Sequence, residues 1–172
     1  MSCASFCSSC DTKNNRGFML VRYGGNFDNN SYDMFHIQQS ATVSVKPGDL
    51  LFTPLVGSQY ITVTTATGNY GVRGTDFLYG TALECSNNSK VDHNHFEFQR
   101  IRDGHQYRIE MKDKTMTQAA LNAYIGTRTL AHYDNPTKKW SIDNTLADSA
   151  ANVFQVMGGN AADGYVLVEI VQ

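Results

Sequence analysis

Apolar and polar residues alternate along most of the chain from Gly17 onward, in short runs separated by clusters of turn-forming residues. Alternation with a period of two is typical of strands that bury one face. The turn-forming clusters include Pro47-Gly48-Asp49, Asp103-Gly104 and Asp163-Gly164, which favour tight turns. The pattern predicts strands over Phe18–Tyr23, Asp33–Gln39, Ala41–Val45, Asp49–Leu55, Gln59–Thr65, Tyr70–Arg73, Phe77–Cys85, His95–Ile101, Gln106–Met111, Tyr124–Tyr133, Lys139–Asp143, Asn152–Met157 and Tyr165–Val171.

One segment, Thr115–Ala123, is a helix candidate, although it lacks a sustained helical period. The rest predicts an all-β protein, because many short strands at near-regular spacing are typical of sandwiches and barrels. Residues 1–16 break the pattern, since they are small, polar and rich in cysteine. We therefore expect a Cys-rich N-terminal arm over 1–16 and a single all-β domain over 17–172.

Three aromatic-led strands recur at a spacing of about 47 residues, a possible internal repeat, and they begin near Tyr60, Tyr107 and Phe154. After the first two, the segments Phe77–Leu83 and Ala123–Leu130 are alike, and His95–Gln99 matches Lys138–Ile142 in position. On these residues the chain resembles a β-trefoil of the ricin-B/fascin type. The resemblance implies three four-stranded units of about 47 residues around a pseudo-threefold axis. A jelly roll or β-sandwich is the alternative, favoured by the turn-then-strand segment Val45–Phe52.

Composition narrows the classes of function. Charged residues make up 17% of the chain, against about 25% in average proteins. The net charge of −2 offers no attraction to nucleic acid or to anionic membranes. The sequence contains no run of 18 apolar residues, so it predicts no membrane-spanning helix. The N-terminus lacks the basic and apolar regions of a signal peptide, so we expect a cytoplasmic protein or leaderless export.

Three of the four cysteines, Cys3, Cys7 and Cys10, lie in the arm, and Cys85 lies in the body. Three thiols and a fourth ligand from Cys85 or a histidine are one possible zinc set. Alternatively, in an oxidising compartment, the four cysteines are candidates for cross-links between subunits. A tail without a role is the third interpretation.

His93, His95 and Glu97 are candidates for a metal site, because alternate residues of a strand share a face. The alternative, which we favour, places His93 in a turn and turns Phe96 and Phe98 towards the core. We therefore predict no metal and no other cofactor.

No catalytic residues are predicted. The chain contains no Gly-x-Ser-x-Gly elbow and no phosphate-binding glycine loop. His36, His105 and His132 are scattered along the sequence, and nothing in it places them beside a serine and an acid.

Sugar recognition combines an aromatic face with amide and carboxylate groups. The candidate ligand-binding residues, in corresponding places of two repeats, are Tyr79, Asn87, Tyr133, Asp134, Asn135 and Trp140. For Trp140 we prefer the alternative that it closes the barrel. The sequence therefore predicts a non-enzymatic module that binds carbohydrate or a glycoconjugate. The alternative is a self-assembling structural subunit of a coat, shell, capsid or filament, whose arm contacts or cross-links its neighbours.

Overall fold

The computed structural model describes residues 17–22, 32–36, 45–52, 63–64, 66–76, 78–82, 95–101 and 103–171. Within them the chain forms strands and one short helix: β1 (Met19–Arg22), β2 (Tyr32–His36), β3 (Leu50–Phe52), β4 (Gly68–Tyr70), β5 (Leu78–Ala82), β6 (His95–Arg100), β7 (Gln106–Glu110), α1 (Gln118–Tyr124), β8 (Arg128–Thr129), β9 (Ala131–Asp134), β10 (Lys139–Ile142), β11 (Phe154–Asn160) and β12 (Tyr165–Ile170). The predicted all-β character is confirmed.

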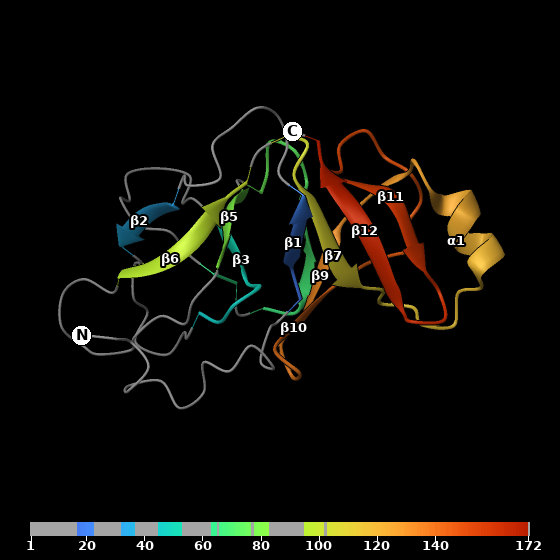
Figure 1. Ribbon diagram of the computed structural model, residues 1–172, viewed down its shortest axis with the longest axis horizontal. Coiled ribbons are helices and arrows are strands. Elements are labelled where there is room, and N and C mark those ends of the chain that lie inside the picture. The colour runs from blue at the N-terminus through green and yellow to red at the C-terminus, as the bar shows by residue number, and fades with distance from the viewer. Residues whose placement is uncertain are drawn as a thin grey trace.

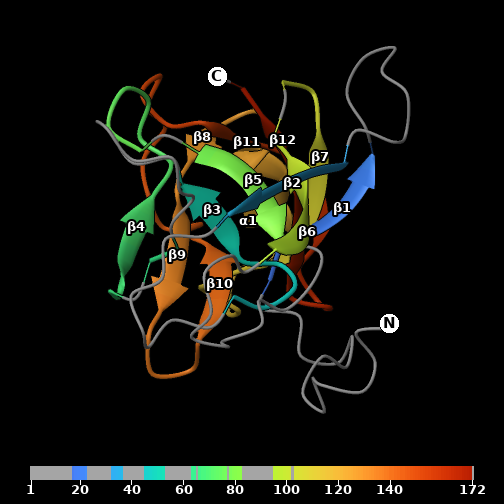
Figure 2. The ribbon, with the colours of Figure 1, turned by 90° about the vertical axis from the view of Figure 1, so that its left-hand side faces the viewer.

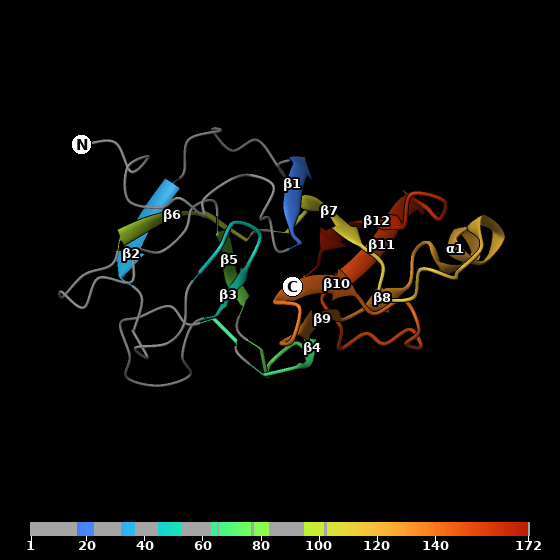
Figure 3. The same cartoon turned by 90° about the horizontal axis from the view of Figure 1, so that it is seen from below.

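The strands form three antiparallel sheets, and none of them closes into a barrel within the described residues. Their strand orders are β1-β7-β12-β11-β8, β10-β9-β4 and β2-β6-β5-β3. In Figure 1, β11, β12 and α1 lie at one end of the molecule, and β2 and β6 lie at the other. Seen from below in Figure 3, α1 is again at the end opposite β2. Around Leu130 the chain passes from the five-stranded sheet, where β8 pairs with β11, into the three-stranded one, where β9 pairs with β10.

Aromatic rings fill the space between the five-stranded and the three-stranded sheets. The indole of Trp140 lies 4.9 Å from the ring of Tyr133 and 6.1 Å from that of Phe18, centroid to centroid. Phe18 in turn lies 5.8 Å from Tyr107 and 5.5 Å from Phe154. All five side chains are buried. Because these rings come from β7, β9, β10, β11 and the residue before β1, they join the two sheets in one core.

The segment predicted as a single strand over Tyr124–Tyr133 is divided, which corrects that expectation. Tyr124 ends helix α1, and strand pairing begins only at Arg128. The helix starts where the hydroxyl of Thr117 accepts a hydrogen bond from the amide of Ala120 at 3.2 Å, which is a favoured N-cap. It buries Leu121 against the core. The helix lies where the sequence offered its one helix candidate, Thr115–Ala123, and it ends one residue later, at Tyr124.

The trefoil resemblance stays a prediction, as does the jelly-roll alternative. Tyr107 and Phe154, which begin two of the three repeats, are in β7 and β11 of the same sheet, on either side of β12. Tyr60, which begins the first repeat, lies outside the described residues, as does the arm over 1–16.

Gly71 allows the backbone to pass directly over the core. Its φ is +106°, and a Cβ at this position would lie 2.5 Å from Cε2 of Phe154. Gly74 also has a positive φ, +77°, but a Cβ there would meet nothing within 4 Å. The two glycines therefore form a matched pair, in which only one is under steric pressure from the core.

We expect Gly74→Ala to lower the free energy of unfolding by about 1 kcal/mol, the cost of a left-handed conformation for alanine. We expect Gly71→Ala to cost about 1–3 kcal/mol more, because the methyl group also overpacks the core. Urea denaturation of the two variants measures the difference. Equal losses would show that the Phe154 ring yields freely at Gly71.

Candidate functional site

The three-stranded sheet turns one side to the core and a polar side outward. Tyr133 and Ala131 in β9 are buried, whereas His132 and Asp134 alternate with them. The register pairs His132 with Asn69 of β4 and with Ser141 of β10. We define the polar face as the outward side chains of this sheet, which are Asn69, His132, Asp134, Lys139 and Ser141. Figure 2 shows β4, β9 and β10 side by side.

The carboxylate of Asp143, just after β10, is buried beneath the polar face and binds side chains on it. Its side chain is only 2% exposed, and the Nζ of Lys112 lies 2.6 Å from its Oδ2. The same oxygen accepts a hydrogen bond from Nδ2 of Asn69 at 3.1 Å. The other oxygen accepts from the hydroxyl and the amide of Thr145, at 2.6 and 3.3 Å. The buried charge is thus paired and fully hydrogen-bonded, as burial of a carboxylate requires.

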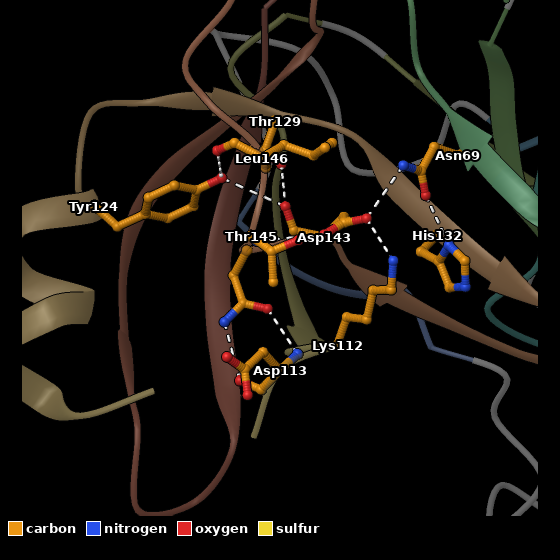
Figure 4. A network of polar contacts seen from close by, with 10 residues as sticks. Asn69, Lys112, Asp113, Tyr124, Thr129, His132, Asp143, Thr145 and Leu146 are labelled. Atoms are coloured by element: carbon orange, nitrogen blue, oxygen red, sulfur yellow. Dashed lines mark hydrogen bonds and ion pairs between the residues drawn. The ribbon is translucent and has the colours of Figure 1, made fainter. Parts of the chain in front are cut away.

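His132 continues the network towards solvent. Its Nδ1 lies 2.6 Å from Oδ1 of Asn69, which is itself held by Asp143. Figure 4 shows the resulting chain from Asp143 through Asn69 to His132, with Lys112 on the other side of the carboxylate. The four side chains come from β4, β9 and the segments that follow β7 and β10. We call Lys112, Asp143, Asn69 and His132 the polar cluster.

The backbone around Asp143 is fixed as well. Its carbonyl accepts a hydrogen bond from the hydroxyl of Thr129 at 2.5 Å. The hydroxyl of Tyr124, from helix α1, lies 3.4 Å from the same carbonyl and donates at 3.0 Å to that of Leu146. The amide of Lys112 donates to the carbonyl of Ile142 at 2.9 Å. The cluster is therefore built on backbone that hydrogen bonds hold in place.

Electrostatics keep Asp143 ionised. Burial by itself raises the pKa of its carboxyl, but the hydrogen bonds from Lys112 and Thr145 outweigh it, so that the pKa lies below the ordinary 3.8. The pKa of His132 lies below the ordinary 6.5, because of partial burial and of the positive charge of Lys112. The negative charges of Asp143 and Asp134 act in the opposite direction and do not reverse it. His132 is therefore neutral at neutral pH.

Two of the predicted sugar-binding residues belong to the core. Tyr133 and Trp140 are each 2% exposed, and the indole Nε1 donates to Oδ1 of Asp49 at 3.2 Å. Neither ring presents a face to a ligand, which corrects the assignment of Tyr133 as a ligand-binding residue. The burial of Trp140 agrees with the alternative that we preferred for it, in which the indole belongs to the core. The physical reason is the alternation of β9 and β10, which turns both residues inward.

Asp134 and Asn135 form the turn between β9 and β10. The carboxylate of Asp134 accepts hydrogen bonds from the hydroxyl and the amide of Thr137, at 2.5 and 3.3 Å. The side-chain oxygen of Asn135 accepts from the ammonium of Lys138. Both side chains thus stabilise their own turn, as Asp and Asn do in many loops, with part of their hydrogen-bonding capacity used there.

Tyr79 lies in β5, in another sheet from Tyr133 and Trp140, and the guanidinium of Arg100 covers its ring at 4.9 Å from the centroid. The structure therefore does not bring Tyr79 together with the other candidates. Asn87, His93 and all four cysteines (Cys3, Cys7, Cys10 and Cys85) lie outside the described residues.

The backbone register of the four-stranded sheet places His95 of β6 opposite His36 of β2, and Glu97 opposite Met34. Among the residues described by the structure, no group of three His, Cys, Asp or Glu side chains is arranged to hold a metal ion. The metal candidates His93, His95 and Glu97 are not tested by this, because His93 is outside that part.

The polar cluster was not predicted from the sequence, in which His132 stands isolated. The fold places His132 opposite Ser141 and links it to Asp143 through the amide of Asn69. The available signal was the alternation in Ala131–Asp134, which turns His132 outward beside buried neighbours. No local sequence motif predicts that Asn69 and Lys112 join His132 in this cluster.

Comparison of the chain with protein-family models, curated proteins and solved structures gives no match. In the part of the chain that the structure describes, no helix has the length and apolar character needed to cross a membrane.

Proposed function

We propose that this protein is a non-enzymatic binding module that recognises carbohydrate through the polar face of the β4–β9–β10 sheet. The observation that supports the proposal is the polar cluster. Its hydrogen bonds fix an amide and an ammonium group on a buried carboxylate, and an imidazole on that amide, from four backbone segments. Groups that are ordered before binding lose less entropy on binding, which favours affinity.

The chemistry of the cluster suits hydroxyl groups. A sugar hydroxyl both donates and accepts hydrogen bonds, and the cluster offers donors on Lys112 as well as an acceptor on His132. Ser141, opposite His132, adds a hydroxyl to the same row. Because Tyr133 and Trp140 are buried, recognition on this face depends on hydrogen bonds rather than on stacking against these rings.

Lys112 and Lys114 provide a matched test of the site. Lys112 contacts Asp143 in the cluster, whereas Lys114 forms an exposed ion pair with Glu110 at 2.7 Å. Each alanine variant removes one positive charge, so that nonspecific charge effects are equal. We expect the wild-type protein to bind members of a glycan array, and Lys112→Ala to weaken that binding about 10- to 100-fold, since a charged hydrogen bond is lost.

Lys114→Ala is expected to bind as the wild type does, and circular dichroism checks that both variants fold. Equal binding by the two variants would place the binding surface elsewhere. Binding of no glycan by the wild-type protein would refute the proposal. The position of Ser141 also calls for an assay of ester hydrolysis with p-nitrophenyl acetate, and hydrolysis abolished by Ser141→Ala would contradict a non-enzymatic function.

A further inference from the structure

The position of the proton on His132 follows from the partners in the cluster. An ionised carboxylate only accepts hydrogen bonds, so the group that Asn69 turns to Asp143 is its NH₂. The side-chain oxygen of Asn69 is then the atom that faces Nδ1 of His132 at 2.6 Å. Because this oxygen also only accepts, Nδ1 is the nitrogen that carries the proton. The buried charge of Asp143 thus sets the tautomer of His132 through Asn69.

The second ring nitrogen, Nε2, is left with a lone pair. Figure 4 shows it turned away from Asn69 and Asp143, and no hydrogen bond joins it to any residue in the described part of the chain. A neutral imidazole that donates through one nitrogen accepts through the other. The cluster therefore ends, on the solvent side, in one fixed hydrogen-bond acceptor.

We propose that Nε2 of His132 accepts a hydrogen bond from a hydroxyl group of a neutral glycan, and that protonation of His132 switches this binding off. The inference rests on the proposed function, and it names the ligand class. A carboxylate group has no proton to donate at neutral pH, so its oxygens face the lone pair of Nε2 without forming a hydrogen bond. A sugar hydroxyl donates there, and its oxygen still accepts a hydrogen bond from another donor.

Acid acts on the acceptor itself. Protonated imidazole carries a hydrogen on both nitrogens, so Nε2 changes from an acceptor to a donor. The charged groups around the ring are Lys112, on the segment after β7, Asp143 after β10, and Asp134 on β9 itself, with Lys139 of β10 opposite Asp134. Partial burial and Lys112 hold the pKa of His132 below 6.5, so the switch operates below neutral pH.

The tautomer is tested without any ligand by ¹⁵N NMR of the imidazole nitrogens in the full-length protein. We expect the signal of Nε2 to be that of an unprotonated nitrogen and that of Nδ1 to be protonated at neutral pH. Asn69→Ala removes the acceptor at Nδ1, so the proton is expected to move in part to Nε2. A wild-type spectrum with the proton on Nε2 would overturn the inference.

The acceptor role is tested by repeating the glycan array at about pH 8 and at steps down to about pH 4, well below the ordinary histidine pKa. The ¹⁵N signals of His132, recorded at the same pH values, show where the ring takes up its second proton. We expect wild-type signals for neutral glycans to fall about tenfold in acid, the loss of one hydrogen bond with its partner left unpaired. His132→Gln presents an amide oxygen as an acceptor that does not titrate. It is expected to retain binding at all of these pH values, whereas His132→Ala is expected to lose binding at all of them.

The outcomes separate this inference from the proposed function. Two results would refute the role of His132 and leave carbohydrate binding intact. In the first, the protein binds the array although the proton is on Nε2. In the second, His132→Gln loses as much binding in acid as the wild-type protein does. The expected tautomer with no array binding would refute carbohydrate binding and confirm the proton position alone. Preference for anionic glycans, or binding abolished by EDTA, would contradict the hydroxyl-donor ligand.

Discussion

Replacing Trp140 by alanine is expected to lower the free energy of unfolding by about 3–5 kcal/mol, the range for loss of a large buried aromatic side chain. The indole is 2% exposed and lies against the rings of Tyr133, Tyr70 and Phe18, with centroid distances of 4.9, 5.6 and 6.1 Å. For a chain of this size the expected fall in melting temperature is about 10 °C. Denaturation by urea, followed by circular dichroism, measures the loss.

Trp140→Phe is the control for this experiment. It retains most of the apolar volume and removes the indole donor to Oδ1 of Asp49, so we expect a loss of about 1–2 kcal/mol. Because Trp140 is the single tryptophan of the chain, its fluorescence in the wild-type protein reports the same burial as a short emission wavelength. Quenching of that emission by a bound glycan, or a negligible loss in the free energy of unfolding for Trp140→Ala, would show that Trp140 is at the surface and not in the core.

The strands could be predicted because their signal is local. In β12, the alternation Tyr165–Ile170 produces buried residues at every second position, as the sequence pattern indicates. The short helix α1 was less visible, since it depends on the cap at Thr117 and on one buried residue, Leu121. Its seven residues are too few for a helical period to stand out.

The polar cluster could not be predicted, because its members are distant in sequence. Asn69 and Asp143 are 74 residues apart, and Lys112 and Asp143 are 31 apart. The pairing of β4 with β9 and of β9 with β10 brings Asn69, His132 and Asp143 together. A parallel bridge between Met111 and Ile142 places Lys112 beside Asp143. A single sequence specifies which face of a strand is polar, but not which strand lies beside it. The assignment of Tyr133 to a binding site was wrong because the alternation in β9 that turns His132 outward turns Tyr133 into the core.

Asp143→Ala is the second substitution with a large expected effect, a loss of about 2–3 kcal/mol in the free energy of unfolding. It removes the acceptor for Lys112, Asn69 and the two donors of Thr145 at once. The expected loss stays below that of a fully buried ion pair, because the Lys112 side chain is 38% exposed and its ammonium group can turn to water. Asp163→Asn, at an exposed position, is the control and is expected to change stability by less than about 0.5 kcal/mol.

The pH dependence of stability identifies the carboxylate as the cause. The pKa of Asp143 is below 3.8 in the folded protein, so the unfolded chain takes up its proton first as the pH falls. The stabilisation from Asp143 is therefore complete above about pH 5 and is lost as the pH falls through the folded-state pKa. Asp143→Asn retains the size of the side chain but cannot titrate, so its stability is expected to fall less steeply in acid than that of the wild type.

Glu110 and Asp113 also have lowered pKa values, through hydrogen bonds from Lys114 and Thr115, but they contribute equally to both proteins and cancel in the difference. Urea titrations of the wild type and of Asp143→Asn between about pH 3 and about pH 7 span the ordinary pKa of aspartate and give that difference. A gap in stability that narrows as the pH falls would confirm that the ionised form of Asp143 holds the polar cluster together. A gap that is constant with pH would show that the cluster depends on the shape of the side chain and not on its charge.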